Sequence, residues 1–489
     1  MHSSALRALG PTLFAFACSL AACSADDAGS KADAAPFGGA DVQADSFGGG
    51  GVDAGGSDTG ASTADDTADR GATDSGTTDA APDVAVAADA AADAATDAAT
   101  AADAGAPTCT PGYWVVELGG TGEDIGRAGL PMADGGVLAV GSTDGGGVAS
   151  VGKGGRDVWM VRVDGQGALV WEQVVGNDLN QEALAIAAHA GGGATVAGTW
   201  REHGDTAPRG WVQQIDDKGA ALATHTFAQA DFTEVHGVSE GAVQGQTGVR
   251  LLVAGYVEKP SGDFQLALAR LDPTTLAPQW TVAHGDTGFD VAWSVRSLAD
   301  GSIAAIGDTA PGGSGPHVQL LTFDAAGKQL WQRTYFGDGE DSGWAFATYP
   351  DATGGNAGFT VVGSRKAPGA SVSAAWLMHA DGKGIKTWEQ TISAPGGATA
   401  YDIDRVPGGG AVVVGKLAQS AGQAKAALWR VDDGGAAQWT LAEGATGGQA
   451  HAALAWSDAV GLVGQSGNAA LSQLLLVRAN MAGKTSCQP

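Results

Sequence analysis

Positively charged residues are scarce in this sequence. The 489 residues include 26 Lys and Arg but 54 Asp and Glu, which gives a formal net charge of −28. Proteins that bind nucleic acid need a basic surface to displace the counterions of the phosphate backbone. The composition therefore argues against nucleic acid as a partner.

Motifs of catalysis and metal binding are also lacking. The chain has four cysteines, and no C-x-x-C, H-E-x-x-H or G-x-S-x-G motif occurs in it, so the common zinc, metalloprotease and serine-hydrolase signatures are missing. The eight histidines beyond the first residues fall at unrelated positions, and none pairs at a metal-ligand spacing. We predict no catalytic residue.

Apolar runs long enough to span a membrane are absent. Residues 1–22 combine Arg7 with a shorter apolar stretch, a pattern typical of an export signal. The sequence LAAC, which ends at Cys23, resembles the lipobox of bacterial lipoproteins. The resemblance implies cleavage before Cys23, lipidation of its sulfur, for example with palmitate, and sorting to the outer membrane because Ser24 follows. The sequence leaves open which face of that membrane carries the protein. An ordinary secretory signal is the alternative.

Residues 23–107 consist almost entirely of Ala, Asp, Gly, Ser and Thr. Between residues 24 and 107 there are 17 Asp, no Glu, one Lys and one Arg, so more than half of the negative charge lies in this stretch. No apolar stripe is available to bury. We therefore expect a disordered tether between the lipid anchor and a folded domain at 108–489.

The rest of the chain is repetitive. Seven apolar segments end in glycine, with a period of 49–57 residues, at Gly141, Gly198, Gly255, Gly307, Gly363, Gly415 and Gly464. Seven more end in Asp or Asn, and most of these lead to a third segment that begins with Trp. Four-stranded propeller blades have such a period. The sequence thus predicts an all-β fold, a seven-bladed β-propeller of four-stranded antiparallel blades.

The second and third segments are joined by a D-x-x-G-x-x-x-W pattern, as in DAAGKQLW (324–331). Asp accepts backbone N–H bonds in a tight turn, and Gly adopts the positive φ that a short hairpin requires. We expect the Trp to cover the seam between neighbouring blades. The copy that begins at Asp272 has no Gly and one more residue, so its turn is expected to differ.

The two ends of the folded domain complete each other. The segment YWVVELGGTGEDIG (113–126) matches LWQRTYFGDGEDSG (330–343) and supplies an outer strand with no blade of its own, while the last copy stops after its turn. We expect strand 113–118 to close the seventh blade, which leaves no exposed sheet edge. Cys109 and Cys487 are expected to form a disulfide in an exported protein. Two unpaired thiols are the alternative.

The segment VRLLVAGYVEKPSGDFQLALARLD (249–272) and its copies resemble bacterial secreted β-propeller repeats of the SBBP type, over all of 109–489. This resemblance implies an exported propeller and no particular activity. A weaker likeness is to quinoprotein propellers, whose repeats also contain Asp, a turn Gly and Trp. The adjacent cysteine pair of the dehydrogenases in that class is missing here.

One group of acids has a regular place, about ten residues after the Trp position and at the start of the innermost strand. Its members are Asp124, Glu182, Glu234, Asp290 and Asp341. Each can cap its own turn by accepting backbone N–H bonds, or can simply be solvated. Alternatively, the five ring one mouth of the central channel and attract a cation such as Ca²⁺, or a basic ligand. No other cofactor is predicted.

The leading hypothesis is a monomeric envelope lipoprotein that presents the propeller as a binding or scaffold module for a protein or a glycan. Its contact with the membrane is expected to be the lipid anchor. The alternatives are a propeller enzyme, either a hydrolase, a lyase or quinoprotein-like, with its site at the channel mouth, and an outer-membrane assembly factor. Only five tyrosines occur in the chain, which weighs against the enzyme.

Overall fold

The computed structural model describes residues 112–485, except residues 190, 243–247, 286, 312–314, 338, 351–355 and 468–471. The expected signal peptide, the lipidated Cys23, the tether and the Cys109–Cys487 pair lie outside the described residues. Within those residues, no helix is long and apolar enough to cross a membrane. The structure therefore bears on the folded domain.

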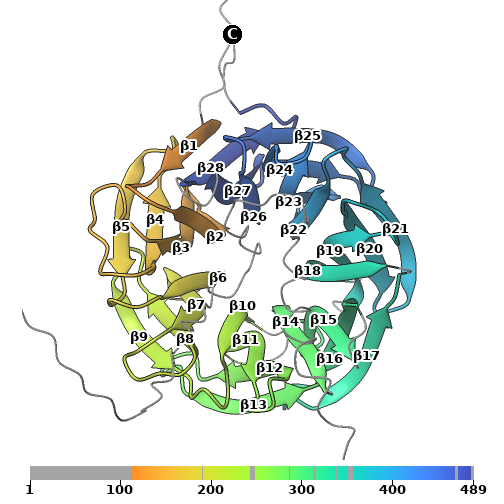
Figure 1. The fold of residues 1–489 in the computed structure, drawn as a ribbon, viewed down its shortest axis with the longest axis horizontal. Helices are drawn as coiled ribbons and strands as arrows, with labels where there is room; N and C mark the ends of the chain where they lie inside the picture. The colour runs from red at the N-terminus through yellow and green to blue at the C-terminus, as the bar shows by residue number, and fades with distance from the viewer. Residues whose placement is uncertain are drawn as a thin grey trace, which may run out of the picture. The chain divides into compact units, whose positions relative to one another are not determined.

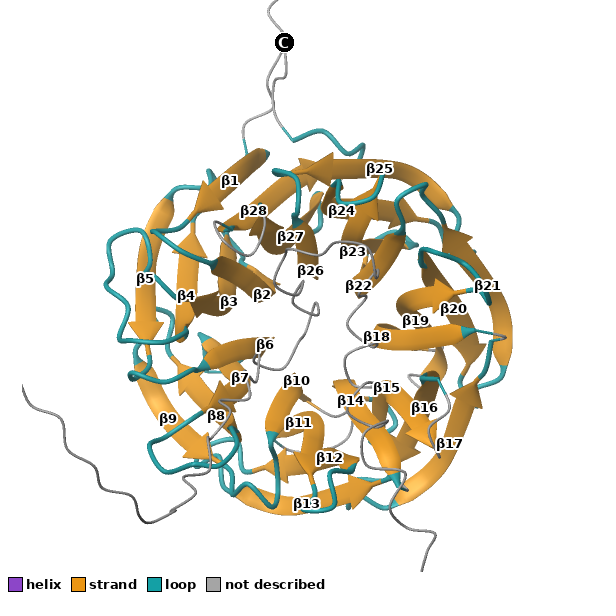
Figure 2. Cartoon of the chain, viewed as in Figure 1, coloured by secondary structure: helices purple, strands orange, loops and turns teal. Residues whose placement is uncertain are grey.

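The described part of the chain is all β (Figure 2). Most strands contain many Val, Leu and Ala residues, whose side chains bury apolar surface between packed sheets. The strands are β1 (Trp114–Leu118), β2 (Asp124–Pro131), β3 (Val137–Thr143), β4 (Asp157–Val163), β5 (Leu169–Val175), β6 (Glu182–Ala188), β7 (Ala194–Trp200), β8 (Arg209–Ile215), β9 (Ala221–Thr226), β10 (Glu234–Ala242), β11 (Val249–Glu258), β12 (Phe264–Leu271), β13 (Pro278–His284), β14 (Gly288–Ser297), β15 (Ile303–Pro311), β16 (His317–Phe323), β17 (Gln329–Tyr335), β18 (Glu340–Pro350), β19 (Asn356–Lys366), β20 (Ala374–Asp381), β21 (Lys386–Ile392), β22 (Ala398–Arg405), β23 (Ala411–Ala418), β24 (Ala424–Val431), β25 (Ala437–Glu443), β26 (Gln449–Ala455), β27 (Ala459–Ser466) and β28 (Gln473–Asn480).

Antiparallel pairing gathers these strands into groups of four. Five four-stranded sheets have the orders β2-β3-β4-β5, β6-β7-β8-β9, β18-β19-β20-β21, β22-β23-β24-β25 and β1-β28-β27-β26. The groups β10–β13 and β14–β17 form one eight-stranded sheet, because a single parallel pair, Phe264 and Phe289, joins them. Figure 1 shows the groups around a common centre, with β2, β6, β10, β14, β18, β22 and β26 innermost. The repeated four-stranded antiparallel sheets expected from the sequence are confirmed.

The D-x-x-G segments form the hairpin turns between the third and fourth strands. In the first copy, Asp164 Oδ1 accepts hydrogen bonds from Gln166 N and Ala168 N, both at 2.9 Å, and Gly167 has a φ of 80°. The same pair of bonds recurs at Asp216, Asp324, Asp381, Asp432 and Asn480. The turn chemistry therefore explains the repeated spacing, because glycine adopts this φ without strain.

Each turn glycine also lies against a tryptophan of another group. A Cβ atom on Gly167 would lie 3.0 Å from the Trp114 indole. The same close approach joins Gly219 to Trp171, Gly327 to Trp280, Gly384 to Trp331, Gly435 to Trp388 and Gly483 to Trp439. Several indoles also donate a hydrogen bond to a carbonyl of the turn, as Trp439 does to Met481 O at 3.0 Å. The tryptophans therefore cover the seams between neighbouring groups, as expected.

One seam has neither the tryptophan nor the glycine. Ala223 stands at the tryptophan position of β9, and the turn after Asp272 places Leu276 at a φ of 59°. The Leu276 side chain is fully buried, and Ala223 packs against the hydrophobic cluster to which it belongs. The larger turn side chain thus fills space that an indole fills at the other seams.

The first strand pairs with the last one. β1 runs antiparallel to β28, from Trp114 opposite Arg478 to Leu118 opposite Leu474. Trp114 is buried and donates its Nε1–H to Gly165 O at 3.1 Å. β1 therefore occupies the outer position that β5 and β9 occupy in their own groups.

Candidate functional site

Every innermost strand contains one extra residue, a β-bulge, at the same place. Where β2 pairs with β3, the register skips Arg127 between Gly126 and Ala128. The seven bulge residues are Arg127, Leu184, His236, Trp293, Trp344, Tyr401 and His451. Bulges re-aim side chains and are common beside functional sites. All seven residues line one cavity, and we call them the collar.

The bulges explain the seven glycines that recur in the second strands. The residue before each bulge lies opposite one of these glycines, as Gly126 lies opposite Gly141. A Cβ atom on any of the seven would lie 1.8–2.2 Å from a carbonyl oxygen of the inner strand, so a side chain is excluded there. The sequence interpretation placed these glycines at strand ends. That was wrong, because every second strand continues past its glycine.

Five collar side chains form a continuous aromatic row. The ring centroids are 4.7 Å apart for His236 and Trp293, 5.1 Å for Trp293 and Trp344, 6.1 Å for Trp344 and Tyr401, and 5.8 Å for Tyr401 and His451. Aromatic rings at such distances attract one another. Burial lowers the pKa of His451 well below its usual value, so this ring is neutral at neutral pH.

Polar neighbours hold the collar in place. Arg127 Nε donates to Glu182 Oε1 at 2.8 Å, and Trp293 Nε1 donates to Asp308 Oδ2 at 3.0 Å. Asp308 also accepts a hydrogen bond from Gly343 N at 2.9 Å, which ties β15 to β18. Burial raises the pKa of the Asp308 carboxyl to about 7, although these hydrogen bonds lower it. Asp308 is thus a buried acid that titrates near neutral pH.

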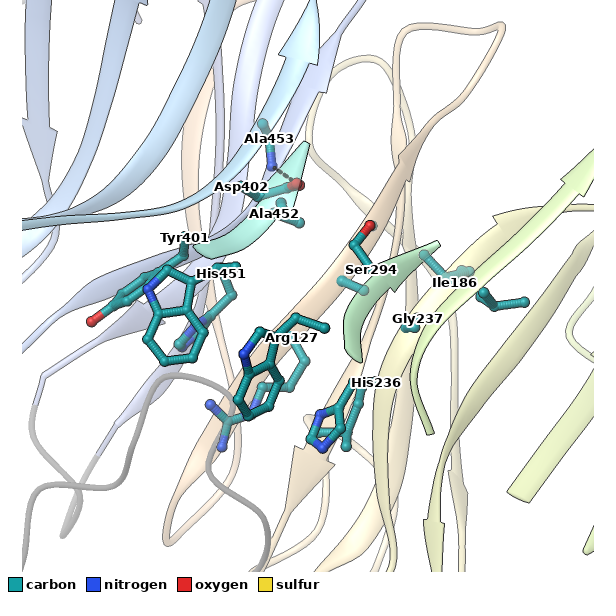
Figure 3. A pocket seen from close by; sticks show the side chains of 18 of the residues that line it. Arg127, Ile186, His236, Gly237, Ser294, Tyr401, Asp402, His451, Ala452 and Ala453 are labelled. Carbon is teal, nitrogen blue, oxygen red and sulfur yellow. Dashed lines mark hydrogen bonds between the residues drawn. The ribbon is translucent and has the colours of Figure 1, made fainter. Parts of the chain in front are cut away.

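The residues that follow the bulges are small in all but one strand. They are Ala128, Ala185, Gly237, Ser294, Ala345 and Ala452, and the exception is Asp402. Together with the collar they line a cavity of about 210 Å³, which we call the chamber. Figure 3 shows Tyr401, His451, Arg127 and His236 in a row that runs from the left to the lower right, with Asp402, Ala452 and Ser294 above and to the right of that row. Small side chains therefore leave room for the chamber beside the collar.

One side of the chamber wall carries two carboxylates. Asp402 Oδ2 accepts a hydrogen bond from Ala453 N at 2.9 Å, and Asp404 Oδ1 accepts one from Arg405 N at 2.8 Å. The two aspartates alternate with one residue on β22, so they point to the same face of the strand. Burial raises the pKa of both carboxyls to about 6, and the charge of Arg296 opposes the rise. At neutral pH both are mostly ionised.

The five acids expected at the channel mouth occupy two successive registers. Asp124, Asp290 and Asp341 lie opposite Thr143, Thr309 and Arg365, whereas Glu182 and Glu234 lie opposite Thr199 and Tyr256. Successive strand residues point to opposite faces, so the two sets face different ways. None of the five lines the chamber.

Each of these acids has a partner of its own. Asp124 Oδ2 accepts a hydrogen bond from Gly120 N at 2.9 Å, which favours the capping interpretation for this residue. The other partners are Arg127 for Glu182, His236 for Glu234, Gln319 for Asp290 and Arg365 for Asp341. In the described part of the chain, no three His, Cys, Asp or Glu residues gather as a metal site. A shared Ca²⁺ site stays a prediction.

The sequence reasoning did not identify the collar or Asp402. A signal for the collar was present, since an aromatic or basic residue stands three positions after Asp124, Asp290 and Asp341 and two positions after Glu234, whereas Leu184 stands two positions after Glu182. The spacing differs because the acids are not equivalent. Counted from the Trp position instead of the acids, the bulge residue follows by 13 residues in six copies and by 12 residues at His451.

No protein-family model matches the sequence, and no curated protein matches it. Among solved structures, one similar chain is a protein of unknown function from Dyadobacter fermentans, with 10% identity and a TM-score of 0.43, over 76% of this chain and 99% of that one. Another is quinohemoprotein alcohol dehydrogenase from Comamonas testosteroni, with 11% identity and a TM-score of 0.41, over 78% of this chain and 77% of that one. The likeness to secreted propeller repeats stays a prediction, and the function has to be inferred from the residues of the chamber.

Proposed function

We propose that the folded domain is a seven-bladed β-propeller and that β1 closes it by completing the last blade. Seven inner strands with the same bulge support the blade count. Support for closure comes from β1, which pairs with β28 while its Trp114 lies against the turn after β4. β2 also contacts β26 and β27. Such a closure leaves no sheet edge open to other chains.

In this proposal the domain is a binding module, and its ligand enters the chamber. The main observation in support is the collar. Ligand sites are usually preformed, concave and largely apolar, with a few placed polar groups. The chamber combines an aromatic row with Asp402 and Arg127 in this way. A cavity of about 150 Å³ accommodates benzene in another protein, so 210 Å³ suits one sugar ring or one amino-acid side chain. We expect the ligand to be such an end group of an envelope protein or glycan.

The binding function is tested by filling the chamber. Ala452→Leu and Ala345→Leu each place a larger side chain in its wall, whereas Ala221→Leu makes the same change at an exposed site on β9. The full chain and each variant are incubated with an envelope extract, washed, and analysed by native mass spectrometry. We expect a bound species on the wild type and on Ala221→Leu, and its loss from both chamber variants with folded spectra. Binding that is equal on all four proteins, or no bound species on the wild type, would contradict the proposal.

The proposal also places the protein at the cell envelope through a lipid on Cys23. Cys23→Ser removes the sulfur that the lipid needs, so the protein should leave the membrane fraction and become soluble. Cys18→Ser, a substitution inside the expected signal peptide, is the matched control and should leave the protein on membranes. Fractionation with an immunoblot measures both. Cys23→Ser protein that still sediments with membranes would show that the anchor is not this lipid.

A further inference from the structure

The described wall of the chamber has two carboxylates and two guanidiniums, and one of the guanidiniums is engaged by a glutamate outside the wall. Asp402 and Asp404 contribute two carboxylates, and Arg296 contributes one guanidinium. Arg127, the other cation that lines the chamber, is paired with Glu182. Charge in a water-poor cavity is costly unless an opposite charge compensates it. The wall therefore favours a ligand with a positive charge.

The collar offers the aromatic faces that an organic cation prefers. Trp293, Trp344 and Tyr401 are consecutive members of the aromatic row and all three line the chamber. A cation over the face of Trp or Tyr is attracted by the quadrupole of the ring, and aromatic cages bind quaternary ammonium ligands in this way. Tyr401 is the bulge residue of β22, and both Tyr401 and the following Asp402 line the chamber, so the carboxylate and the aromatic faces belong to one site.

Most side chains in the rest of the wall have no hydrogen-bond acceptor. Five of the seven positions after the bulges are Ala or Gly, namely Ala128, Ala185, Gly237, Ala345 and Ala452. A primary ammonium has three N–H donors, and a donor left without a partner in such a cavity is unfavourable. A methylated ammonium has few N–H donors, or none, that need a hydrogen-bond partner. Its methyl groups pack against apolar walls.

From these features we infer that the group that enters the chamber is a methylated organic ammonium ion, held between Asp402 and the faces of Trp344 and Tyr401. This inference rests on the proposed binding function and names the ligand class of the same site. It gives the Asp402 carboxylate a counter-ion inside the chamber, and it assigns the aromatic row a role beyond packing.

Binding of such a cation depends on the ionisation of Asp402. The other charged or titratable groups that line the chamber are Arg296 on β14, Asp404 and Tyr401 on β22, His451 on β26, His236 on β10 and Arg127 on β2. Since burial raises the pKa of Asp402 to about 6, the carboxylate is present at pH 8 and largely protonated at pH 5. Affinity should therefore fall as the pH is lowered.

The test uses choline and its uncharged isostere 3,3-dimethyl-1-butanol, titrated calorimetrically into the full chain. We expect choline to bind at pH 8, at least tenfold more tightly than the isostere, and about tenfold less tightly at pH 5. Asp402→Asn and Trp344→Ala should each weaken choline binding about tenfold, and Asp402→Asn should remove most of the pH dependence. Trp344→Phe keeps an aromatic face and should cost less than Trp344→Ala. Asp217→Asn makes the same charge change at an exposed turn and should have no effect.

These outcomes distinguish the inferred ligand class from the proposed binding function on which it rests. Equal binding of choline and the isostere would contradict the inference that the ligand is a cation. It would not contradict the proposal that the chamber binds a ligand. If choline does not bind to the wild type, the inference is likewise wrong. The binding function is then decided by whether the extract ligand is lost from Ala452→Leu and Ala345→Leu.

Discussion

A chain that begins at Gly119 is expected to aggregate, or to lose several kcal/mol of stability, relative to one that begins at Gly112. The shorter chain lacks β1, so β28 loses the partner that pairs with it from Leu474 to Arg478. It also loses Trp114, a buried side chain of the cluster between β1, β4 and β28. Truncating a buried Trp to Ala alone typically costs about 3–5 kcal/mol. The freed edge of β28 is in addition a template for pairing with other chains.

Both chains lack Cys109, so the comparison isolates the strand from the expected disulfide. Size-exclusion chromatography reports association, and urea unfolding reports the free energy. A chain from Gly119 that stays monomeric and unfolds at the same urea concentration would rule out closure by β1. The variant Trp114→Ala in the full chain separates the contribution of the indole from that of the strand.

The second large effect is a loss of stability with rising pH that originates at Asp308. Its pKa is about 7 in the folded state, against an ordinary value of 3.8. Between these values the folded protein binds a proton that the unfolded chain has released, so the free energy of unfolding falls as the pH rises. One pKa unit corresponds to about 1.4 kcal/mol, which makes the contribution about 4 kcal/mol between pH 4 and pH 8. Asp402 and Asp404 act in the same direction because their pKa values are also raised.

Asp308→Asn isolates this contribution. The amide cannot ionise, but its NH₂ group cannot accept from both Trp293 Nε1 and Gly343 N as the carboxylate does. The variant should therefore be less stable than the wild type at pH 4, and the difference should shrink or reverse towards pH 8. Urea unfolding across this range measures it, with the exposed Asp217→Asn as the control. A difference between wild type and Asp308→Asn that is independent of pH would contradict the assigned titration.

The sequence by itself determined the repeat, because its signals are local. The Asp164 carboxylate bonds to amides two and four residues further on, and Gly167 supplies the positive φ within the same turn. Such contacts need only neighbours along the chain, so their spacing is visible in the letters. The irregular turn after Asp272 was foreseen for the same reason, since its missing glycine and extra residue are local features. The replacement of a seam's Trp and Gly by Ala223 and Leu276 was not foreseen, because these two residues belong to different groups of strands.

The tertiary structure alone decided the site. Whether Asp124 and Glu182 share a ring depends on which residues oppose them in the second strands, and they differ by one register because they stand three and two residues before the bulges of their strands. The collar forms only because seven bulges, some fifty residues apart along the chain, meet at one centre. Asp402 was not among the acids predicted at the channel mouth, yet folding brings it to a chamber wall of small residues. The charged and aromatic side chains form one site only because the innermost strands pack around a common centre. Their distances from one another depend on this packing and not on their neighbours along the chain.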